Sequence, residues 1–310
     1  MNLKGNASPD GHISVLRDEV VNYLAPALSK AGTVFIDCTT GLGGHTGAIL
    51  ANVHPLSRCL CVDTDSRNLS KAKSRLEEYG GRLRFFHANF SDIHEVLKES
   101  GTGKVNAILA DLGFASNQMD DPERGMSFQA QGPLDMRLDL TKGLTAEELV
   151  NTLDENELAD IIYHYGEERL SRRIARAIVD ARKIAPIKTT MELAEIVSSA
   201  MPPFAMLRTK GKKIHPATRT FQALRIAVND ELLNLDNLLD ELEEIMAPGG
   251  RVAIISFHSL EDRRVKHAFA ALASAGKANI LTKKPITPTD GEIEVNPRSR
   301  SAKMRVIEFV

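Results

Sequence analysis

Four short apolar runs, each about the length of one β-strand, recur at similar intervals through the first third of the chain. Helical segments separate them, the clearest being Ser66–Tyr79 and Ile93–Glu99, and a further helix starts near Thr46. This alternation is typical of repeated β-α-β units, in which successive strands lie parallel in one sheet. The predicted strands are Thr33–Asp37, Arg58–Asp63, Leu83–His87 and Val105–Ala110.

The alternation stops after the fourth run. Residues 114–144 form a long irregular stretch, and loops of that length usually carry function. Helical segments without strands follow, and an apolar strand returns only at Arg251–Phe257, before a last strand pair at Ile280–Lys284 and Met304–Val310. The helical segments are Thr145–Leu153, Glu155–Tyr165, Glu168–Arg182, Thr190–Ser199 and Asn229–Met246.

The simplest reading of this pattern is an α/β protein with two domains. We expect residues 1–140 and 225–310 to form one Rossmann-like parallel sheet with its helices. Residues 141–224 are expected to form an all-helical insertion between the fourth and fifth strands. A chain of 310 residues is long enough for two such units.

The first predicted strand runs into a glycine-rich turn, Cys-Thr-Thr-Gly-Leu-Gly-Gly-His, at residues 38–45. Glycines at 41, 43 and 44 allow positive φ and the close approach of a ligand. This arrangement is typical of nucleotide-cofactor pockets. Asp37, at the end of the strand, would repel the pyrophosphate of a dinucleotide but suits a cation. The turn therefore favours S-adenosylmethionine, whose sulfonium is positive, over NAD.

Two further residues fit the same pocket. Asp63 ends the second strand, 22 residues after Gly41, where a carboxylate can accept hydrogen bonds from ribose hydroxyls. The alternative is that Asp63 caps the following helix, as Asp65 and Ser66 also could. Phe90 follows the third strand and could lie against an adenine ring or simply belong to the core.

The loop after Asp111 is the candidate catalytic region. Asp111 closes the fourth strand at the edge where open α/β sheets bind ligands, and Asn117, Gln118, Asp120 and Asp121 follow. An exocyclic amine on a base is a poor nucleophile, so a site for it needs acceptors that hold its N–H groups and aim the nitrogen at a methyl group. None of the cysteines lies in a loop at this edge, which disfavours covalent methylation at C5 of a pyrimidine.

A second candidate segment, Ser256–Arg263, follows the fifth strand and contains Ser256, His258 and Asp262. A Ser-His-Asp hydrolase is disfavoured because no Gly-x-Ser-x-Gly elbow accompanies these residues. We expect Ser256 and His258 instead on a substrate-facing loop at the same edge of the sheet.

The three cysteines, Cys38, Cys59 and Cys61, lie in apolar runs. Buried thiols in odd number suit a reducing cytoplasm, and no His or second Cys pair stands at metal spacing, so we expect core positions and no metal site. No apolar run is long enough to span a membrane and the first residues carry no secretory signal, so we expect a cytoplasmic protein.

Positive charge is segregated in a chain whose formal net charge is −2. Two runs without any acidic residue, 196–229 and 296–307, hold clustered cations, the pattern expected of a phosphate-binding face. Because the chain has no tryptophan and few aromatic residues, a folded RNA surface is favoured over a bare strand. The cations are Arg208, Lys210, Lys212, Lys213, Arg219 and Arg225 in the first run, and Arg298, Arg300, Lys303 and Arg305 in the second.

Several long motifs resemble one family, the bacterial 16S ribosomal RNA (cytosine-N4)-methyltransferases of the MraW/RsmH type. The resemblance extends from His12 to Arg305. The motifs begin at Asp111 (DLG), Asp120 (DDPERGMSF), Gly132 (GPLDMR), Tyr165 (YGEER), His215 (HPATRTFQALR), Ser256 (SFHSLEDR) and Asn296 (NPRSRS).

The resemblance implies a class I methyltransferase fold with a helical insertion, S-adenosylmethionine as the methyl donor, and N4 of a decoding-centre cytidine in the small ribosomal subunit as acceptor. It places the cofactor on Gly43, Gly44, His45, Asp63, Phe90, Asp111 and Gln118. Together with the loop chemistry it makes Asp111, Asn117, Ser256 and His258 the candidate catalytic residues, and Arg208, Lys210, Lys212, Lys213, Arg219, Arg298 and Arg300 the candidate RNA-binding residues.

The chain departs from the family pattern in small ways. Asn117 stands where the family usually has proline, Met126 where it usually has phenylalanine, and the segment after Phe269 is short. The sequence also leaves other functions open. These are methylation of another amine, an NAD-dependent oxidoreductase and a non-catalytic ribosome assembly factor.

Overall fold

The computed structural model describes residues 13–114, 116–202, 208–209, 212–213 and 215–310. The chain divides into two compact units. Residues 1–115 and 232–310 form the first, the sheet unit, and residues 116–231 form the second, the helical unit. Among the described residues, no helix combines the length and the apolar character needed to cross a bilayer.

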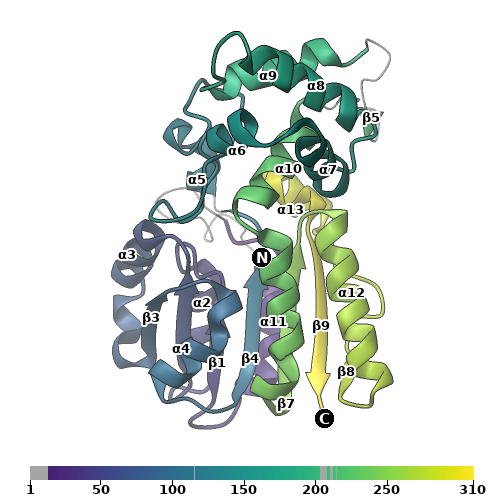
Figure 1. Ribbon diagram of the computed structural model, residues 1–310. Helices are drawn as coiled ribbons and strands as arrows, with labels where there is room; N and C mark the ends of the chain where they lie inside the picture. The colour runs from purple at the N-terminus through teal and green to yellow at the C-terminus, as the bar shows by residue number, and fades with distance from the viewer. Residues whose placement is uncertain (1–12, 115, 203–207, 210–211, 214) are drawn as a thin grey trace. The chain divides into compact units, whose positions relative to one another are not determined.

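The sheet unit is built on seven strands in the order β3-β2-β1-β4-β7-β9-β8 (Figure 1). The first five in this order run parallel, and β9 pairs antiparallel with both β7 and β8. The strands are β1 (Val34–Asp37), β2 (Arg58–Asp63), β3 (Leu83–His87), β4 (Val105–Asp111), β7 (Met246–Ser256), β8 (Ala278–Ile280) and β9 (Lys303–Phe309).

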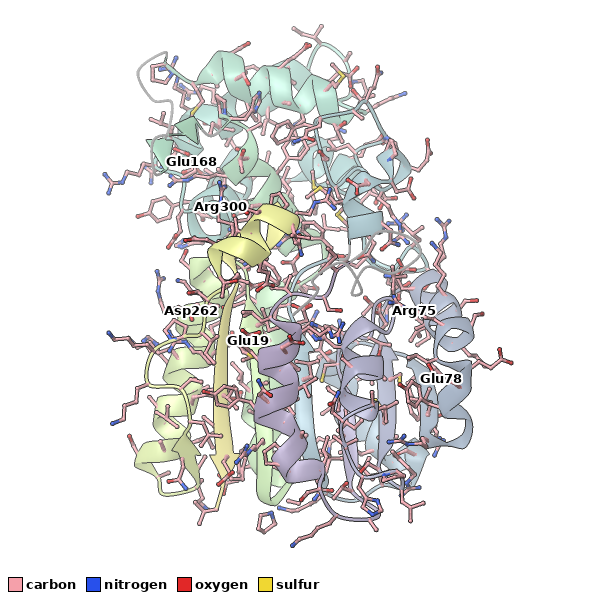
Figure 2. The ribbon with its side chains drawn as sticks, turned by 180° about the vertical axis from the view of Figure 1, so that it is seen from behind. Glu19, Arg75, Glu78, Glu168, Asp262 and Arg300 are labelled. Carbon is pink, nitrogen blue, oxygen red and sulfur yellow. The ribbon has the colours of Figure 1, made fainter. Side chains whose placement is uncertain are left out.

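Both faces of this sheet are covered by helices, as expected of a parallel sheet. Along β1, Val34 and Ile36 pack into a cluster with the apolar sides of α4, α11 and α12, whereas Phe35 packs on the opposite face with α1 and α2. Figure 2, seen from behind, shows α1 with Glu19 over that second face. The helices are α1 (Arg17–Leu24), α2 (Gly44–Leu50), α3 (Ser66–Arg75), α4 (Ile93–Ser100), α11 (Glu231–Ile245), α12 (Ser259–Ser274) and α13 (Asp290–Val295).

This topology confirms the expected class I methyltransferase fold, a Rossmann-like sheet with one antiparallel strand inserted near its edge. The three cysteines occupy buried core positions, as predicted. Short 3-10 turns join several elements: η2 (Ala25–Leu28), η3 (Glu77–Arg82), η4 (Phe90–Asp92) and η7 (Pro297–Ser301).

The helical unit packs its helices around a separate core. Three of its helices begin with a complete capping box, in which Thr145, Asp154 or Thr189 exchanges hydrogen bonds with a glutamate three residues later. Its elements are α5 (Ser116–Asp120), η5 (Pro122–Arg124), α6 (Ala146–Thr152), α7 (Glu155–Gly166), α8 (Ser171–Arg182), α9 (Thr190–Ala200), β5 (Arg208–Thr209), β6 (Lys212–Lys213) and α10 (Thr218–Val228).

The helical unit is larger than the insertion that we expected at residues 141–224. It takes in the irregular stretch after Ala115, because Leu134 and Met136 are fully buried in its core beside Ile162 and Ile174. It also reaches Glu231, whose carboxylate binds Arg225 in two hydrogen bonds.

Two local predictions were wrong, and one helix was not predicted. The insertion is not all-helical, because β5 and β6 form an antiparallel pair within it. The first basic run contains the helix that was not predicted, α10. The segment Ser256–Arg263 is not a loop either: it is the end of β7 and the first turn of α12.

Candidate cofactor and catalytic site

The glycine turn after β1 is held in place by its neighbours on both sides. The N–H of Thr40 donates to the carbonyl of Val62, and the N–H of Gly41 donates to Asp63 Oδ2 at 2.6 Å. On the other side, the hydroxyl of Thr39 accepts a hydrogen bond from the N–H of Asp111 at 2.7 Å. The turn therefore ties the ends of β2 and β4 to the end of β1.

Glycine serves a different purpose at each of its positions in the turn. Gly43 has φ 78°, and a Cβ there would lie 2.8 Å from Leu76 Cδ1. A Cβ on Gly44 would clash with the hydroxyl of Ser14, which can rotate away, so the requirement for glycine is stricter at Gly43. Gly41 has φ 52°, but a Cβ there would come no nearer than 3.8 Å to the Thr39 carbonyl, its nearest neighbour in the described part of the chain. The space over Gly41 can therefore admit a ligand.

Asp37 lies beneath the turn rather than at its surface. Its carboxylate is 1% exposed and accepts hydrogen bonds from the Thr46 hydroxyl at 2.6 Å and from the Thr39 N–H at 3.3 Å. Burial raises its pKa, against the lowering effect of Thr46. Asp37 therefore anchors α2 and contributes negative charge from below, rather than contacting a ligand directly.

Of the two roles predicted for Asp63, the structure excludes helix capping, and ribose binding stays a prediction. It does not cap the next helix, because the N-cap is Asp65, which accepts hydrogen bonds from the N–H groups of Arg67 and Asn68. Instead the two carboxylate oxygens of Asp63 accept from the backbones of Gly41 and Asp65. Burial raises the pKa of Asp63 to about 6, and these two hydrogen bonds oppose that shift only in part. Each oxygen keeps a second lone pair with which it could accept from a hydroxyl.

His45 and Asp111 face each other at the turn. The imidazole Nε2 lies 3.4 Å from Asp111 Oδ2, beyond good hydrogen-bond geometry. Within the described residues, neither ring nitrogen of His45 nor Oδ1 of Asp111 has a hydrogen-bond partner, although all three atoms are buried. Unsatisfied buried polar atoms are uncommon in proteins, and these lie close enough to the Asp37 carboxylate to shift its pKa.

The donors and acceptors at this turn fit S-adenosylmethionine. A ligand with a positive centre and donor hydroxyls would satisfy the remaining lone pairs of Asp63 and the orphaned Oδ1 of Asp111. It would also offset the repulsion of Asp37 by Asp111 and that of Asp63 by Asp65 and Asp37, which adds to burial in raising the pKa of Asp37 and of Asp63.

The remaining candidate cofactor residues, Phe90 and Gln118, are not part of the glycine turn. Phe90 begins η4 at the carboxyl edge of the sheet and is partly buried against the core. Gln118 and Asn117 lie on α5 in the helical unit, Gln118 buried and Asn117 partly exposed. The structure thus brings five of the seven cofactor candidates together around one turn: Gly43, Gly44, His45, Asp63 and Asp111.

Ser256 and His258 have structural partners in the sheet unit. Ser256 is 2% exposed and its hydroxyl donates to the carbonyl of Lys303 on β9. His258 is the N-cap of α12: its Nδ1 accepts from the N–H of Glu261, whose carboxylate accepts from the N–H groups of Phe257 and His258. Both side chains hold the junction between β7 and α12.

The candidate RNA-binding residues fall into three groups. Arg298 and Arg300 are exposed on η7 (Figure 2 labels Arg300). Arg219 is partly exposed, donates to the carbonyl of Glu167 and lies 3.6 Å from the Glu168 carboxylate. Arg208, Lys212 and Lys213 lie on the β5–β6 pair, and Lys210 lies outside the described residues.

Other cations of the two basic runs are neutralised. Arg225 pairs with Glu231, and Arg305 and Lys303 both bind Asp262. Sequence reasoning also missed Thr39 and Thr46, the two hydroxyls that position Asp111 and Asp37. Their signal was the paired threonine before the glycines and the threonine after His45, both beside an acidic strand end.

Comparison with known proteins gives a consistent result. The family model described as the MraW methylase family matches residues 10–310. A protein named ribosomal RNA small subunit methyltransferase H from a Geobacter species is 46% identical over 96% of this chain and 98% of its own. Proteins of the same name from Sorangium cellulosum and Synechococcus elongatus are 49% and 46% identical, over 96% of this chain and 91% and 95% of theirs.

Proposed function

The chain belongs to the MraW methylase family, and on that premise we propose that it transfers a methyl group from S-adenosylmethionine to N4 of a cytidine in the decoding centre of 16S ribosomal RNA. Its relatives are named as small-subunit ribosomal RNA methyltransferases, and the chain matches them over nearly their whole length. The observation that supports the chemistry most directly is the turn after β1, where buried carboxylates converge with an imidazole that has no hydrogen-bond partner among the described residues.

In this proposal the residues of the sheet unit hold the cofactor. Asp63 accepts from the ribose hydroxyls with its remaining lone pairs, and Phe90 lies against the adenine. His45 and Asp111 would receive the polar groups of the methionine portion. When bound, S-adenosylmethionine would supply an electrophilic methyl group.

The acceptor is held by hydrogen-bond acceptors rather than activated by a strong base. The lone pair of the cytosine amine is delocalised into the ring, so the site must orient the N–H groups and stabilise developing positive charge. Asp111 has an oxygen available for this. Ser256 and His258 act indirectly, by holding the start of α12 in position.

The RNA around the target nucleotide needs cations that solvent, and therefore phosphate, can reach. Arg298 and Arg300, exposed on η7, and Arg219, partly exposed, are the proposed phosphate contacts with known exposure, and the basic residues of β5 and β6 are proposed with them from their charge alone. We place the reaction in the cytoplasm, with the small ribosomal subunit as the partner.

Isotopic methyl labelling tests this function. Naked 16S ribosomal RNA and assembled 30S particles lacking the modification are incubated in parallel with labelled S-adenosylmethionine, and the nucleosides are then separated. We expect label in N4-methylcytidine at a single decoding-centre position. Label in an adenine or in a protein would assign another amine, and ribosome binding without any label would indicate a non-catalytic assembly factor.

A cofactor titration distinguishes the proposed methyltransferase from the remaining alternative, an NAD-dependent oxidoreductase. S-adenosylhomocysteine is expected to bind at the turn, and NADH is expected not to compete with it. Preferential binding of NADH would overturn the assignment of the cofactor.

A further inference from the structure

The outward side of α8 carries a row of arginines that the proposed function does not use. Arg172, Arg173 and Arg176 have the i, i+1, i+4 spacing that places them on one side of α8, and Arg169 lies in the turn just before the helix. All four side chains are exposed. The opposite side of α8 is apolar and buried through Ile174, Ala175 and Ile178. We call these four residues the arginine face.

The arginine face is largely without neutralising partners. Among the described residues, Arg169, Arg172 and Arg173 form no ion pair. Arg176 lies 3.5 Å from a carboxylate oxygen of Glu155. The two side chains are 72% and 40% exposed, so solvent screens this ion pair and Glu155 neutralises Arg176 only weakly. By contrast, Arg225 and Arg305 are mostly buried and each bind a carboxylate at 2.7 Å.

The positive charges of Arg172 and Arg173 lie at the end of α8 where the helix dipole disfavours cations. Arg172 and Arg173 lie in the first turn of α8, near the positive end of the helix dipole, and that turn holds no acidic residue. The helices α6, α7 and α9 of the same unit each carry a glutamate there. Glu168 does offer a carboxylate at this end, but it is 4% exposed and already accepts from the N–H of Leu170. Helix stability therefore does not account for the arginines.

Phosphate is the ligand that these side chains suit. Guanidinium groups bind phosphate oxygens in two parallel hydrogen bonds, and the face uses arginine throughout and no lysine. A protein partner would favour apolar or aromatic anchors at the centre of the contact, and charged residues are depleted there. Four adjacent cations without an interleaved acid instead match a backbone-binding surface.

We infer that the arginine face of α8 binds the phosphate backbone of the RNA substrate. This inference rests on the proposed function, and adds to the two basic runs a third contact surface that carries affinity and no sequence information.

The test compares two double variants of the full-length protein. Arg172→Gln/Arg173→Gln removes two charges from the face, and Lys283→Gln/Lys284→Gln removes two from an exposed site after β8 as a matched control. Binding to a 16S ribosomal RNA fragment that the wild type methylates is measured across a salt series. We expect the first variant to bind about tenfold more weakly near 0.1 M salt, with a salt dependence shallower by about 1.5 in log-log slope.

Further readouts separate a binding role from a structural one. S-adenosylhomocysteine affinity and the melting temperature should match the wild type, and the KM for RNA should rise far more than kcat falls. Arg172→Lys/Arg173→Lys, which keeps the charge, should recover most of the salt slope.

The inference fails if the glutamine variant binds RNA like the wild type, or if the control variant loses as much. Normal binding to naked RNA with loss only on 30S particles would assign the face to a ribosomal protein instead. If the wild type itself methylates no RNA, the proposed function fails and not the arginine face alone.

Discussion

Asp63 shows at the scale of one residue what a sequence can and cannot reveal. The spacing after Gly41 correctly indicated a carboxylate at the cofactor turn, but two outcomes were open, ribose binding or helix capping. The structure adds a third use, since Asp63 binds the backbone of the turn itself. That contact depends on the strands β1 and β2 lying side by side, which local sequence does not encode.

Asp63 makes cofactor binding depend on pH. The pKa of about 6 in the free protein means that the carboxyl is largely protonated below pH 6. Hydrogen bonds donated by the ribose hydroxyls favour the charged form of the Asp63 carboxyl, so cofactor binding releases a proton. Affinity for S-adenosylhomocysteine should therefore fall as the pH drops below about 6, by up to tenfold per unit, and level off above about 7.

Calorimetric titration between about pH 5 and 8 measures this dependence. Asp63→Asn should bind roughly 10- to 100-fold more weakly at neutral pH and lose the pH dependence. A wild type whose affinity does not change over this range would contradict a ribose contact at Asp63.

Asp111→Ala should separate catalysis from folding. The backbone N–H of Asp111 already binds Thr39, whereas its Oδ1 has no partner among the described residues, so the side chain contributes little to the folded state. Removing it also relieves repulsion with Asp37. We expect a melting temperature at or above that of the wild type and a loss of methyl transfer of about 100-fold or more. Wild-type turnover in this variant would remove Asp111 from the site.

At the scale of elements, the parallel strands were predictable and the starts of some helices were not. The ends of β1 to β4 agree with the sequence prediction to within one residue, because buried parallel strands are nearly continuous apolar runs. α12 was missed because its N-cap is His258, and histidine is not among the usual capping residues. α10 was missed because its segment was considered only for its clustered cations, although Phe221 and Leu224 are buried on one side of the helix.

The capping role of His258 gives a prediction at this scale. His258→Ala removes the acceptor for the first turn of α12 and should destabilise the protein by about 1 kcal/mol. His258→Asn should restore that stability, because asparagine is a good N-cap, and should keep most of the activity. Urea denaturation and turnover are measured on both variants. Normal stability with lost transfer in the asparagine variant would show instead that the imidazole acts in catalysis.

At the scale of the whole molecule, two cores share one chain. The sheet unit and the helical unit bury separate apolar clusters, and each contains residues that local patterns identified. Their boundary could not be predicted. The stretch after Ala115 has no periodicity, yet Leu134 and Met136 are fixed in the helical core by contacts with residues far along the chain.

Separate cores predict an uneven response to the cofactor. S-adenosylhomocysteine at 100 times its dissociation constant should stabilise the folded sheet unit by about 2.7 kcal/mol. Amide hydrogen exchange should slow in β1, β2 and β4, with little change in α8 and α9 of the helical unit. Equal protection throughout both units would show that they unfold as one cooperative body.

The insertion of the helical unit between two paired strands also sets an order for biosynthesis. Ile108 on β4 pairs with Val252 on β7, so the centre of the sheet cannot close until the entire helical unit has been translated. Until then, β4 presents an open edge in the nascent chain, a state that invites mispairing with other chains. Early folding of residues 116–231 would bring the two ends of that segment together and shorten the search for β7.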